Sequence, residues 1–444
     1  MKKFFTLMLL FCFLCLSAEA KISNKNINST IKEFGISPNS IAISIKNLSN
    51  DRVVYAQNDK ILMHPASVQK ILTIVPIMEV LENDYNFSTE IYSRGNNEYV
   101  IKLGADPYLN HSDLHTLVNN INGQTAKKIY FDDSIIEKKD WGEGWQWDDD
   151  LNPCILRFNA YNLDGNNIKL TIMPGLKGRQ ATIINPSKYP LAFLNYVITD
   201  DKTDIKISRD NVMAANAIKL EGTISSPYTV YIPNNNLKRY FEFKLTKSLE
   251  DNNIYLKEAY GITAIKPTDK KLDEITHPVD TAVKDILQNS NNMAIETLAK
   301  IAGGKYYNKQ GTDTDGINLF NKYCESNGLD NSRIRIVDAS GVSKNNLIDA
   351  DFITEFLVKN QTNPVLNELA QPGSGTLSDR MLPLKNNLKA KTGTLSDISS
   401  IAGYLTTKKG NKFAFCIMIN DPSSKSSDKK NLENYLIRKI YMNL

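Results

Sequence analysis

A serine and a lysine stand three residues apart in the segment 64–73, at the start of an apolar run that predicts a helix over residues 67–82. Residues three apart on a helix share a face, so Ser67 Oγ and Lys70 Nζ can meet. A desolvated lysine can activate a serine without a histidine. The pattern therefore indicates nucleophilic catalysis, although a helix-capping serine beside a solvated lysine has the same spacing.

Two further segments carry polar groups suited to the same chemistry. Residues 290–292 (Ser-Asn-Asn) separate two predicted helices, where a polar loop can point the Ser290 hydroxyl and the Asn292 amide into a cleft. Residues 391–394 (Lys-Thr-Gly-Thr) fall on a predicted strand, where Gly393 would let a ligand approach the backbone closely. The alternatives are a helix cap for the loop and a solvated face for the strand.

The secondary structure predicted around these three segments indicates how the fold positions them. Alternating apolar residues predict strands at 41–46, 52–56, 388–394, 400–407 and 412–420. Two strands near one end of the chain and three near the other predict one antiparallel sheet built from both ends. Apolar spacing predicts further helices at 278–289, 293–302, 313–327 and 350–360. The helix 67–82 is apolar around nearly its whole circumference and should be buried, with a kink caused by Pro76.

The sequence pattern changes between about residues 87 and 275. Short segments of alternating apolar and polar residues, joined by polar loops, predict a mostly β insertion there. Its clearest predicted strands are 98–103, 128–131, 167–173, 182–184 and 204–208. Residues 141–150 hold all three tryptophans of the chain. They favour a packed loop anchor over a carbohydrate platform, because tryptophan mostly serves as buried apolar area.

The N-terminus is typical of a secretory signal peptide. It has a basic start at Lys2 and Lys3, an apolar run over 4–16 and a small-x-small site at 18–20. The run is too short for a comfortable membrane span of about 20 residues, so an uncleaved anchor is the lesser alternative. We therefore expect export to the periplasm or the cell exterior.

Composition and charge limit the class of protein and the kinds of partner. At 444 residues, with 41% hydrophobic and 23% charged residues, the chain is globular and long enough for more than one domain. A formal charge of +4 argues against nucleic acid as a partner. The apolar stripe of residues 432–444 favours a helix packed on the sheet, with peripheral membrane contact as the alternative.

Cysteine and histidine usage predicts neither a disulfide framework nor a metal site. Three cysteines follow the signal segment, and a bridge between Cys154 and Cys324 stays open while Cys416 lies in an apolar run. His111 and His115 have the spacing of a helical metal pair, but no third ligand accompanies them. We expect no metal and no cofactor.

Together the three motifs resemble the set Ser-x-x-Lys, Ser-x-Asn and Lys-Thr-Gly of β-lactamases and penicillin-binding proteins. Their flanks resemble the class C low-molecular-mass penicillin-binding proteins, the D-alanyl-D-alanine carboxypeptidase/endopeptidase family with a large insertion. The matching segments are 65–73, 290–296, 338–343, 375–377 with Arg380, 391–395 and 402–404, with 104–107 and 144–149 inside the insertion. The likeness covers nearly the whole chain after residue 20. It departs at Pro76, at Ala339 and in a shortened insertion.

The resemblance implies an α/β (α+β) fold: a transpeptidase-like domain with a five-stranded antiparallel sheet flanked by helices, plus a β-rich inserted region. The implied division is a signal peptide at 1–20, the catalytic domain at 21–86 and 276–444, and the insertion at 87–275.

The resemblance also implies roles for the site residues. Ser67 would attack the carbonyl, Lys70 would take its proton, and Ser290 would relay a proton to the leaving amine. Substrate would be bound by Asn292, Lys391, Thr392, Gly393 and Thr394. Asp106, Asp338, Ser340 and Arg380 fit structural hydrogen bonding as well as substrate contact.

The implied function is a serine D-Ala-D-Ala carboxypeptidase, also an endopeptidase candidate, acting on peptidoglycan stem peptides ending in D-Ala-D-Ala and acylated by β-lactams. A β-lactamase of the same fold would differ in fast deacylation. A catalytically weak scaffold that binds cell-wall peptide is the alternative outside enzymes, and the intact motifs argue against it.

Overall fold

The computed structural model describes residues 24–209 and 217–444, so the predicted signal segment lies outside it. Contacts divide the chain into two compact units. The first, here the sheet unit, comprises residues 24–65 with 348–362 and 369–444. The second, here the helical unit, comprises 66–347 and 363–368 and includes the insertion. These two units have other boundaries than the predicted catalytic domain (21–86 and 276–444) and insertion (87–275). The predicted division into folding domains therefore stays a prediction.

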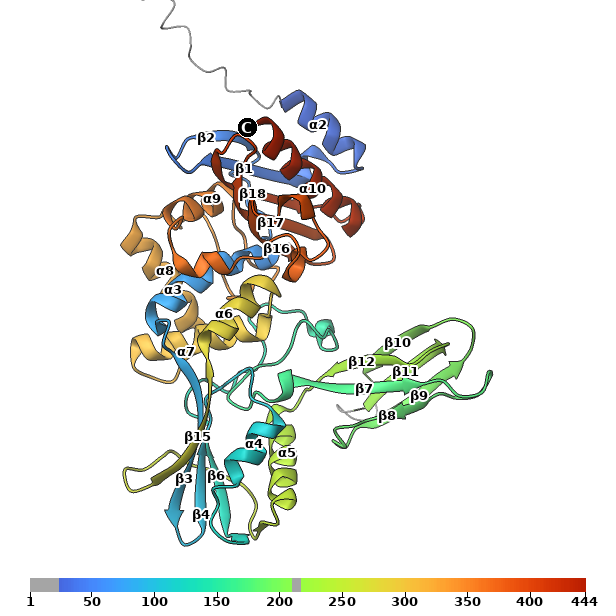
Figure 1. Cartoon of the computed structure of the whole chain (residues 1–444), viewed down its shortest axis with the longest axis vertical. Helices are drawn as coiled ribbons and strands as arrows, with labels where there is room; N and C mark the ends of the chain where they lie inside the picture. Colours follow the sequence, from blue (N-terminus) through green and yellow to red (C-terminus); the bar gives the residue numbers. More distant parts are fainter. Residues whose placement is uncertain (1–23, 210–216) are drawn as a thin grey trace, which may run out of the picture. The chain divides into compact units, whose positions relative to one another are not determined.

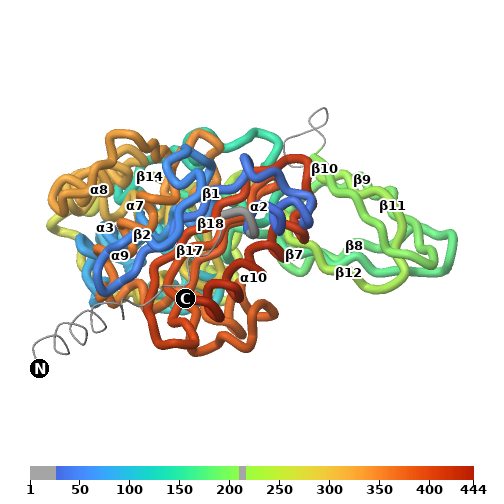
Figure 2. Tube along the Cα trace, turned by 90° about the horizontal axis from the view of Figure 1, so that it is seen from above, coloured from blue at the N-terminus to red at the C-terminus, as the bar shows by residue number. Residues whose placement is uncertain are grey.

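The sheet unit is built on five antiparallel strands in the order β16-β17-β18-β1-β2. Their bounds are β1 Ile41–Asn47, β2 Val53–Gln57, β16 Leu388–Thr394, β17 Ile398–Thr406 and β18 Lys412–Asn420. Its helices are α2 Asn24–Glu33, α9 Ala350–Lys359 and α10 Ser426–Asn443. Figure 2 shows β1 running between β2 and β18, so strands from the two chain ends share one sheet, as the sequence predicted.

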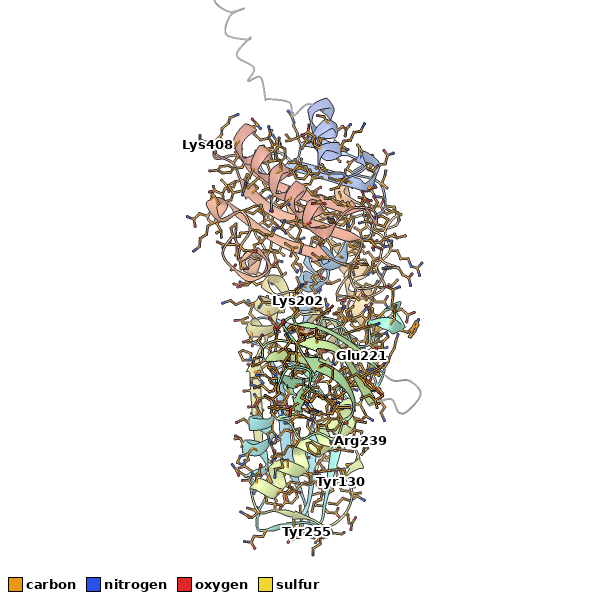
Figure 3. All side chains as sticks on the ribbon, turned by 90° about the vertical axis from the view of Figure 1, so that its right-hand side faces the viewer. Tyr130, Lys202, Glu221, Arg239, Tyr255 and Lys408 are labelled. Carbon is orange, nitrogen blue, oxygen red and sulfur yellow. The ribbon has the colours of Figure 1, made fainter. Side chains whose placement is uncertain are left out.

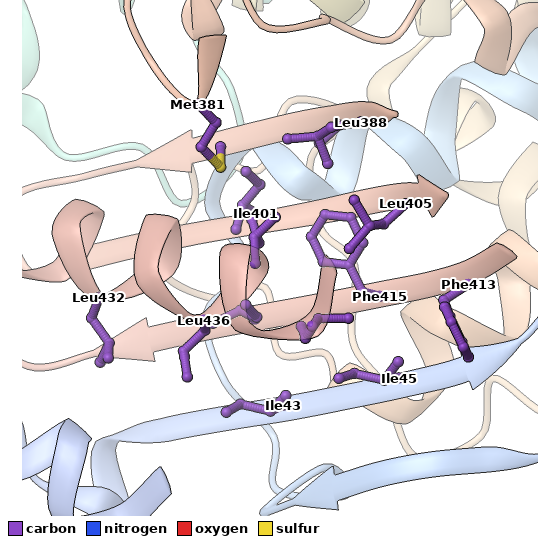
Figure 4. Close-up of a cluster of buried hydrophobic side chains, with 14 of the residues drawn as sticks. Ile43, Ile45, Met381, Leu388, Ile401, Leu405, Phe413, Phe415, Leu432 and Leu436 are labelled. Carbon is purple, nitrogen blue, oxygen red and sulfur yellow. The ribbon is translucent and has the colours of Figure 1, made fainter. Parts of the chain in front are cut away.

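Alternation along β1 gives this sheet two buried faces. Ile43 faces a core that also contains Leu432 and Leu436 of α10 (Figure 4). The neighbouring Ser44 points to the other face, where its hydroxyl lies 2.7 Å from that of Thr354 on α9. A helix therefore covers each face, and the stripe of the last helix packs on the sheet as predicted.

Arg380, matched in the family resemblance, has a structural partner within the sheet unit. Its guanidinium lies 2.8 Å from the buried carboxylate of Glu433 on α10. Glu433 also accepts a hydrogen bond of 2.6 Å from Ser399 on β17. The side chain of Arg380 thus ties the segment before β16 to the helix that covers the sheet.

The helical unit packs α3 (Lys70–Leu81) against α6 (Val279–Gln288), α7 (Asn292–Tyr307) and α8 (Asp313–Asn327). α3 includes Pro76 without ending there. The predicted end of α7 at residue 302 is wrong, because the helix continues across Gly303 and Gly304. A Cβ at Gly303 would meet Asp315 of α8, so this glycine allows close helix packing and does not mark a terminus.

The insertion opens and closes with two paired strands. β3 (Asn86–Gly95) and β15 (Lys270–Pro278) are antiparallel, with Asn86 opposite Pro278. They belong to a sheet ordered β14-β6-β4-β3-β15, in which β4 is Glu98–Lys102, β6 is Lys128–Asp132 and β14 is Gly261–Ile262 (Figure 1).

The rest of the insertion combines small sheets with two helices that the sequence reading missed. The sheets are β12-β7-β8 and β10-β11-β9. Their strands are β7 Asn167–Met173, β8 Thr182–Ile184, β9 Ala192–Thr199, β10 Asp204–Arg209, β11 Ala217–Ile224 and β12 Tyr228–Pro233. A two-stranded pair joins β5 (Thr125–Ala126) to β13 (Tyr255–Leu256). α4 (His111–Val118) and α5 (Leu237–Asp251) pack against each other, while most of the other regular structure of the insertion is strand, as the sequence predicted.

Residues 24–209 and 217–444 contain three cysteines, and all three thiols are free. Cys154 is exposed, whereas Cys324 and Cys416 are buried. The bridge between Cys154 and Cys324 that the sequence left open is therefore not formed. Within the same residues, no helix combines the length and apolarity needed to cross a membrane. No cluster of His, Cys, Asp and Glu suited to a metal ion occurs among them either.

Candidate active site

Ser67 and Lys70 meet at the junction of two helix types. Ser67 lies in a 3-10 turn, Ala66–Gln69, and Lys70 is the first residue of α3. Three residues complete a 3-10 turn, so side chains three apart are aligned along it. Lys70 Nζ lies 2.8 Å from Ser67 Oγ, while Ser67 itself is only half-buried. A buried amine and an accessible hydroxyl are therefore hydrogen-bonded, as the spacing predicted.

Lys70 is fully buried and has two more acceptors besides Ser67. Its Nζ lies 2.5 Å from Asn292 Oδ1 and 2.7 Å from the carbonyl oxygen of Ser340. Burial lowers the pKa of Lys70 to about 7, and the carboxylates of Asp338 and Glu296 oppose that shift. A lysine with this pKa is partly neutral near pH 7 and can accept a proton from a serine.

Acylation of Ser67 should therefore accelerate as the pH rises through about 7. Only neutral Lys70 can accept the proton, and burial sets the pKa of Lys70 at about 7. Below that pH the neutral fraction falls roughly tenfold per unit, and above it the rate should level off. Stopped-flow acylation by a chromogenic cephalosporin across the pH range measures this. A midpoint near the ordinary lysine value of about 10.4 would contradict the assignment.

The loop 338–343 is fastened to the helix that carries Lys70. Gln69 Nε2 donates to the backbone oxygen of Asp338 at 2.5 Å, and Thr73 Oγ1 donates to the carbonyl of Ala339 at 2.8 Å. Together with the bond from Lys70 to Ser340, three consecutive carbonyls of this loop accept hydrogen bonds from side chains at the start of α3. The loop therefore sets the position of the Lys70 amine.

Asp338 holds this loop together from inside. Its carboxylate is buried and accepts six hydrogen bonds, three on each oxygen. Oδ1 accepts from Gln69 Nε2, Gly341 N and Asn346 Nδ2, and Oδ2 accepts from Trp145 Nε1, Ser340 Oγ and Ser343 N. The sequence left two roles open for Asp338 and Ser340, structural hydrogen bonding and substrate contact. These contacts support structural hydrogen bonding.

Glu296 and Trp145 complete the support of the loop. Glu296 on α7 is buried and accepts the backbone N–H groups of Ala339 and Ser340, at 3.2 and 2.8 Å. Burial, helped by the Asp338 charge, raises the pKa of Glu296 to about 8. Trp145 packs on Phe158, with ring centroids 5.7 Å apart, and donates its indole N–H to Asp338. The favoured interpretation of the tryptophan segment as a packed anchor is confirmed for Trp145, whereas Trp147 is 81% exposed.

The loop 290–292 places its residues differently from the simple cap hypothesis. The N-cap of α7 is Asn291, whose side chain accepts the N–H of Ala294. Asn292 is thereby freed for Lys70, and its Nδ2 donates to the carbonyl of Cys154 at 2.7 Å. Ser290 adopts φ 68° and lines a cavity of about 490 Å³ together with Asn292.

A methyl group at Gly341 should displace Ser67 without touching it. Gly341 has φ +82°, and a Cβ there would meet the carbonyl of Ala66, which itself has the unusual φ of 48° and directly precedes Ser67. Displacing a catalytic group by about 1 Å can slow a reaction roughly 10²-fold, so Gly341→Ala should slow acylation by that order.

The matched control is Gly178→Ala, because Gly178 has a similar φ of +79° but a Cβ there would meet nothing within 4 Å. Both variants are compared by their rates of labelling with a fluorescent penicillin. Equal rates for Gly341→Ala and the unmutated protein would show that this close approach does not position Ser67.

The segment 391–394 lies in the sheet unit, on β16. Lys391 is buried and its Nζ donates to the carbonyl of Thr392 at 2.8 Å. Thr392 Oγ1 donates to Thr376 Oγ1 at 2.7 Å, which joins the strand to the Gly-Thr-Leu segment at 375–377. Thr394 is exposed and Gly393 is buried. Lys391 is thus not a solvated strand lysine, contrary to the alternative considered for it.

The sequence did not reveal the residues that hold the loop 338–343 and Asn292 in place around Lys70. Gln69, Thr73, Glu296 and the carbonyl of Cys154 were given no role, although three of these residues lie inside or beside matched segments. Asp106 has a structural partner, His277 Nδ1 at 2.5 Å.

A model of the D-Ala-D-Ala carboxypeptidase 3 (S13) family matches residues 23–439. The chain belongs to this family. It is accordingly a serine-type hydrolase, and the resemblance to the class C penicillin-binding proteins is confirmed.

Similarity to relatives and to solved structures extends over most of the chain. It is 24% identical to D-alanyl-D-alanine carboxypeptidase DacB of Haemophilus influenzae, over 87% of this chain and 86% of the relative. It is 22% identical to the D-alanyl-D-alanine carboxypeptidase of Actinomadura sp. strain R39, over 83% and 76%. The crystal structure of penicillin-binding protein 4 from Haemophilus influenzae superposes with a TM-score of 0.82 at 20% identity, covering 94% of this chain and 99% of that one. The predicted fold class is therefore confirmed.

Proposed function

We propose that this S13 enzyme removes the terminal D-alanine from peptidoglycan stem peptides through an acyl-enzyme on Ser67. The observation that carries the proposal is the buried Lys70 amine, 2.8 Å from Ser67 Oγ. Burial lowers the pKa of this amine to about 7, which suits a base near neutral pH. The substrate class comes from the relatives, which are named as D-alanyl-D-alanine carboxypeptidases.

The first half-reaction joins Ser67 Oγ to the carbonyl carbon of the penultimate D-alanine. The Ser67 proton passes to neutral Lys70 as the bond forms. The C–N bond to the last D-alanine then breaks, and a proton relayed through Ser290 leaves with its amine. In the second half-reaction, water adds to the ester carbon, Ser67 departs and recovers its proton, and the shortened peptide is released as a carboxylate.

Substrate contacts are assigned by motif and by family. Lys391 supplies positive potential, Thr392 and Thr394 bind the terminal carboxylate, and Gly393 admits the substrate backbone. The backbone N–H groups of Ser67 and Thr394 are proposed as the oxyanion hole, in which a single donor is worth about 2.7–4 kcal/mol. Asn292 would hydrogen-bond the substrate amide by exchanging its present acceptor, the carbonyl of Cys154.

The apolar run and cleavage pattern of residues 1–20 support action outside the cytoplasm, in the cell envelope where peptidoglycan lies. β-Lactams, which resemble the D-Ala-D-Ala end, are proposed as covalent inhibitors acting on Ser67. Penicillin-binding protein 4 from Haemophilus influenzae, whose solved structure resembles this chain with a TM-score of 0.76, forms a complex with a β-lactam.

Labelling with a fluorescent penicillin tests the proposal directly. The purified protein should carry a stable label that mass spectrometry locates on Ser67, Ser67→Ala should carry none, and a pentapeptide ending in D-Ala-D-Ala should release D-alanine. Absence of label on the unmutated protein would refute the acyl-enzyme. Rapid loss of label would favour a β-lactamase, and label without D-alanine release would favour a cell-wall-binding scaffold.

A further inference from the structure

The hairpin that joins β16 to β17 carries Thr394 near its tip. Backbone hydrogen bonds of 3.1 and 3.3 Å join Leu395 and Ile398 in both directions, so residues 396 and 397 form the turn. The next pair along the ladder is Thr394 opposite Ser399. Hydrogen-bonded and non-hydrogen-bonded pairs alternate in an antiparallel ladder, so the pair of Thr394 is a non-hydrogen-bonded one. The backbone N–H of Thr394 therefore points away from β17, at the outermost strand of the sheet.

Two buried side chains of α10 hold the tip of this hairpin. Lys429 Nζ donates to the carbonyl oxygen of Asp397 in the turn, at 3.0 Å. The Glu433 carboxylate accepts the hydroxyl of Ser399, directly opposite Thr394, at 2.6 Å. An outermost strand is held by a neighbouring strand on one side only, so its end depends on such anchors. Lys429 and Glu433 are four residues apart and share one face of the helix.

Both anchors are themselves fixed. The second oxygen of the Glu433 carboxylate lies 2.8 Å from the Arg380 guanidinium. The carbonyl of Asp397 also accepts the backbone N–H of Asp421, just after β18, at 3.0 Å. Replacing buried ionic groups by apolar ones of similar volume is often neutral or stabilising. Covering the sheet does not require a buried lysine and a buried carboxylate, so their contacts with the hairpin point to a role in positioning it.

We propose that Lys429 and Glu433 are positioning residues for the backbone N–H of Thr394. The inference rests on the proposed function, which assigns this N–H to the oxyanion hole. A donor of that hole is effective only when it points at the place where the oxyanion develops. α10 fixes the direction of this donor through the turn and through Ser399, and neither anchor touches the substrate.

The test replaces one group in each of the two contacts. Ser399→Ala removes the hydroxyl that binds Glu433, and Lys429→Met removes the amine while keeping most of the side-chain volume. The rate constant of acylation by a chromogenic cephalosporin should fall about tenfold in each variant. The dissociation constant of the complex that precedes acylation should change less than about twofold, because no oxyanion exists there. Stopped-flow measurements over a range of cephalosporin concentrations separate the two constants.

Matched controls come from elsewhere in the sheet unit. Ser44→Ala removes a buried hydroxyl that also bonds to a covering helix. Lys46→Met removes a buried lysine that lies 2.8 Å from the Asp351 carboxylate on α9. Lys408→Met removes an exposed lysine beyond the far end of β17, labelled in Figure 3. All three should keep the acylation rate constant, even where the first two lower the melting temperature as much as the test variants do.

The carbonyl stretch of the acyl-enzyme gives a readout that a loss of stability alone does not move. Hydrogen bonds in the oxyanion hole weaken the ester C=O bond and lower its stretching frequency. Isotope-edited infrared spectra of the penicillin acyl-enzyme should therefore show this band at higher frequency in Ser399→Ala and Lys429→Met. The band should keep its position in Ser44→Ala and Lys46→Met.

Ser399→Ala, which deletes a single oxygen atom, decides the case if Lys429→Met does not fold. An unchanged acylation rate and an unchanged band in Ser399→Ala would overturn the inference, as would equal changes in Ser44→Ala. Failure of the proposed function is distinct, since the unmutated protein would then carry no penicillin label.

Discussion

Replacing Lys70 by methionine is expected to reduce the rate of penicillin acylation by about 10²–10⁴-fold, the range that a positioned general base contributes. Methionine fills nearly the same buried volume without an amine. Ser67 Oγ would then lack the group, now 2.8 Å away, that accepts its proton. Acylation rate constants from stopped-flow labelling measure the effect.

The same substitution separates catalysis from folding. Lys70→Met leaves Asn292 Oδ1 and the Ser340 carbonyl without their present donor, at about 1–3 kcal/mol each, but removes the burial of an ionisable amine. A modest change in melting temperature is therefore expected beside the large loss of rate. Lys322→Met, on the exposed face of α8, is the control and should change neither. An acylation rate for Lys70→Met within tenfold of the unmutated protein would refute the assigned base.

Asp338→Asn is expected to destabilise the helical unit by on the order of 3–5 kcal/mol. The buried carboxylate accepts three hydrogen bonds on each oxygen, so an amide placed there turns an NH₂ group toward three donors in either orientation. Urea unfolding followed by tryptophan fluorescence measures the loss. Asp330→Asn, at an exposed position, is the control.

Asp338→Asn should also move the pH dependence of acylation. The Asp338 carboxylate raises the pKa of Lys70 against the effect of burial. Without that charge the pKa of Lys70 falls further, so the midpoint of the rise in acylation rate should shift to lower pH. A shift to higher pH, or unchanged stability, would contradict the role given to Asp338.

Local pattern was sufficient for the bounds of several regular elements. β16, β18 and α8 were predicted with the bounds that the structure gives them. α8 carries its own signals, because Thr312 and Asp315 form a capping box at its start and Gly328 adopts φ 65° at its end. Such signals are local, so they can be recognised without knowledge of the fold.

Local signals were not sufficient for elements and contacts that depend on residues distant in the sequence. α5 has buried residues at helical spacing, Leu237, Phe241, Leu245 and Leu249, yet the polar segments around it hid the pattern. The six donors on Asp338 come from Gln69, Trp145, Asn346 and the loop itself, and only folding brings Gln69 and Trp145 to it. Ser67 and Lys70 were found because their contact spans a single turn.

The paired strands β3 and β15 have a consequence for how the chain folds. Residues opposite each other in such a ladder have Cα atoms only about 4.5–5.5 Å apart, so the long excursion between Asn86 and Pro278 starts and ends at nearly one point. Pairing of β3 with β15 thus returns the chain to the end of α3 after the excursion, so that α6 and α7 follow directly beside it. The contact between Asn292 and Lys70 is thereby kept although the two residues are separated by the whole insertion.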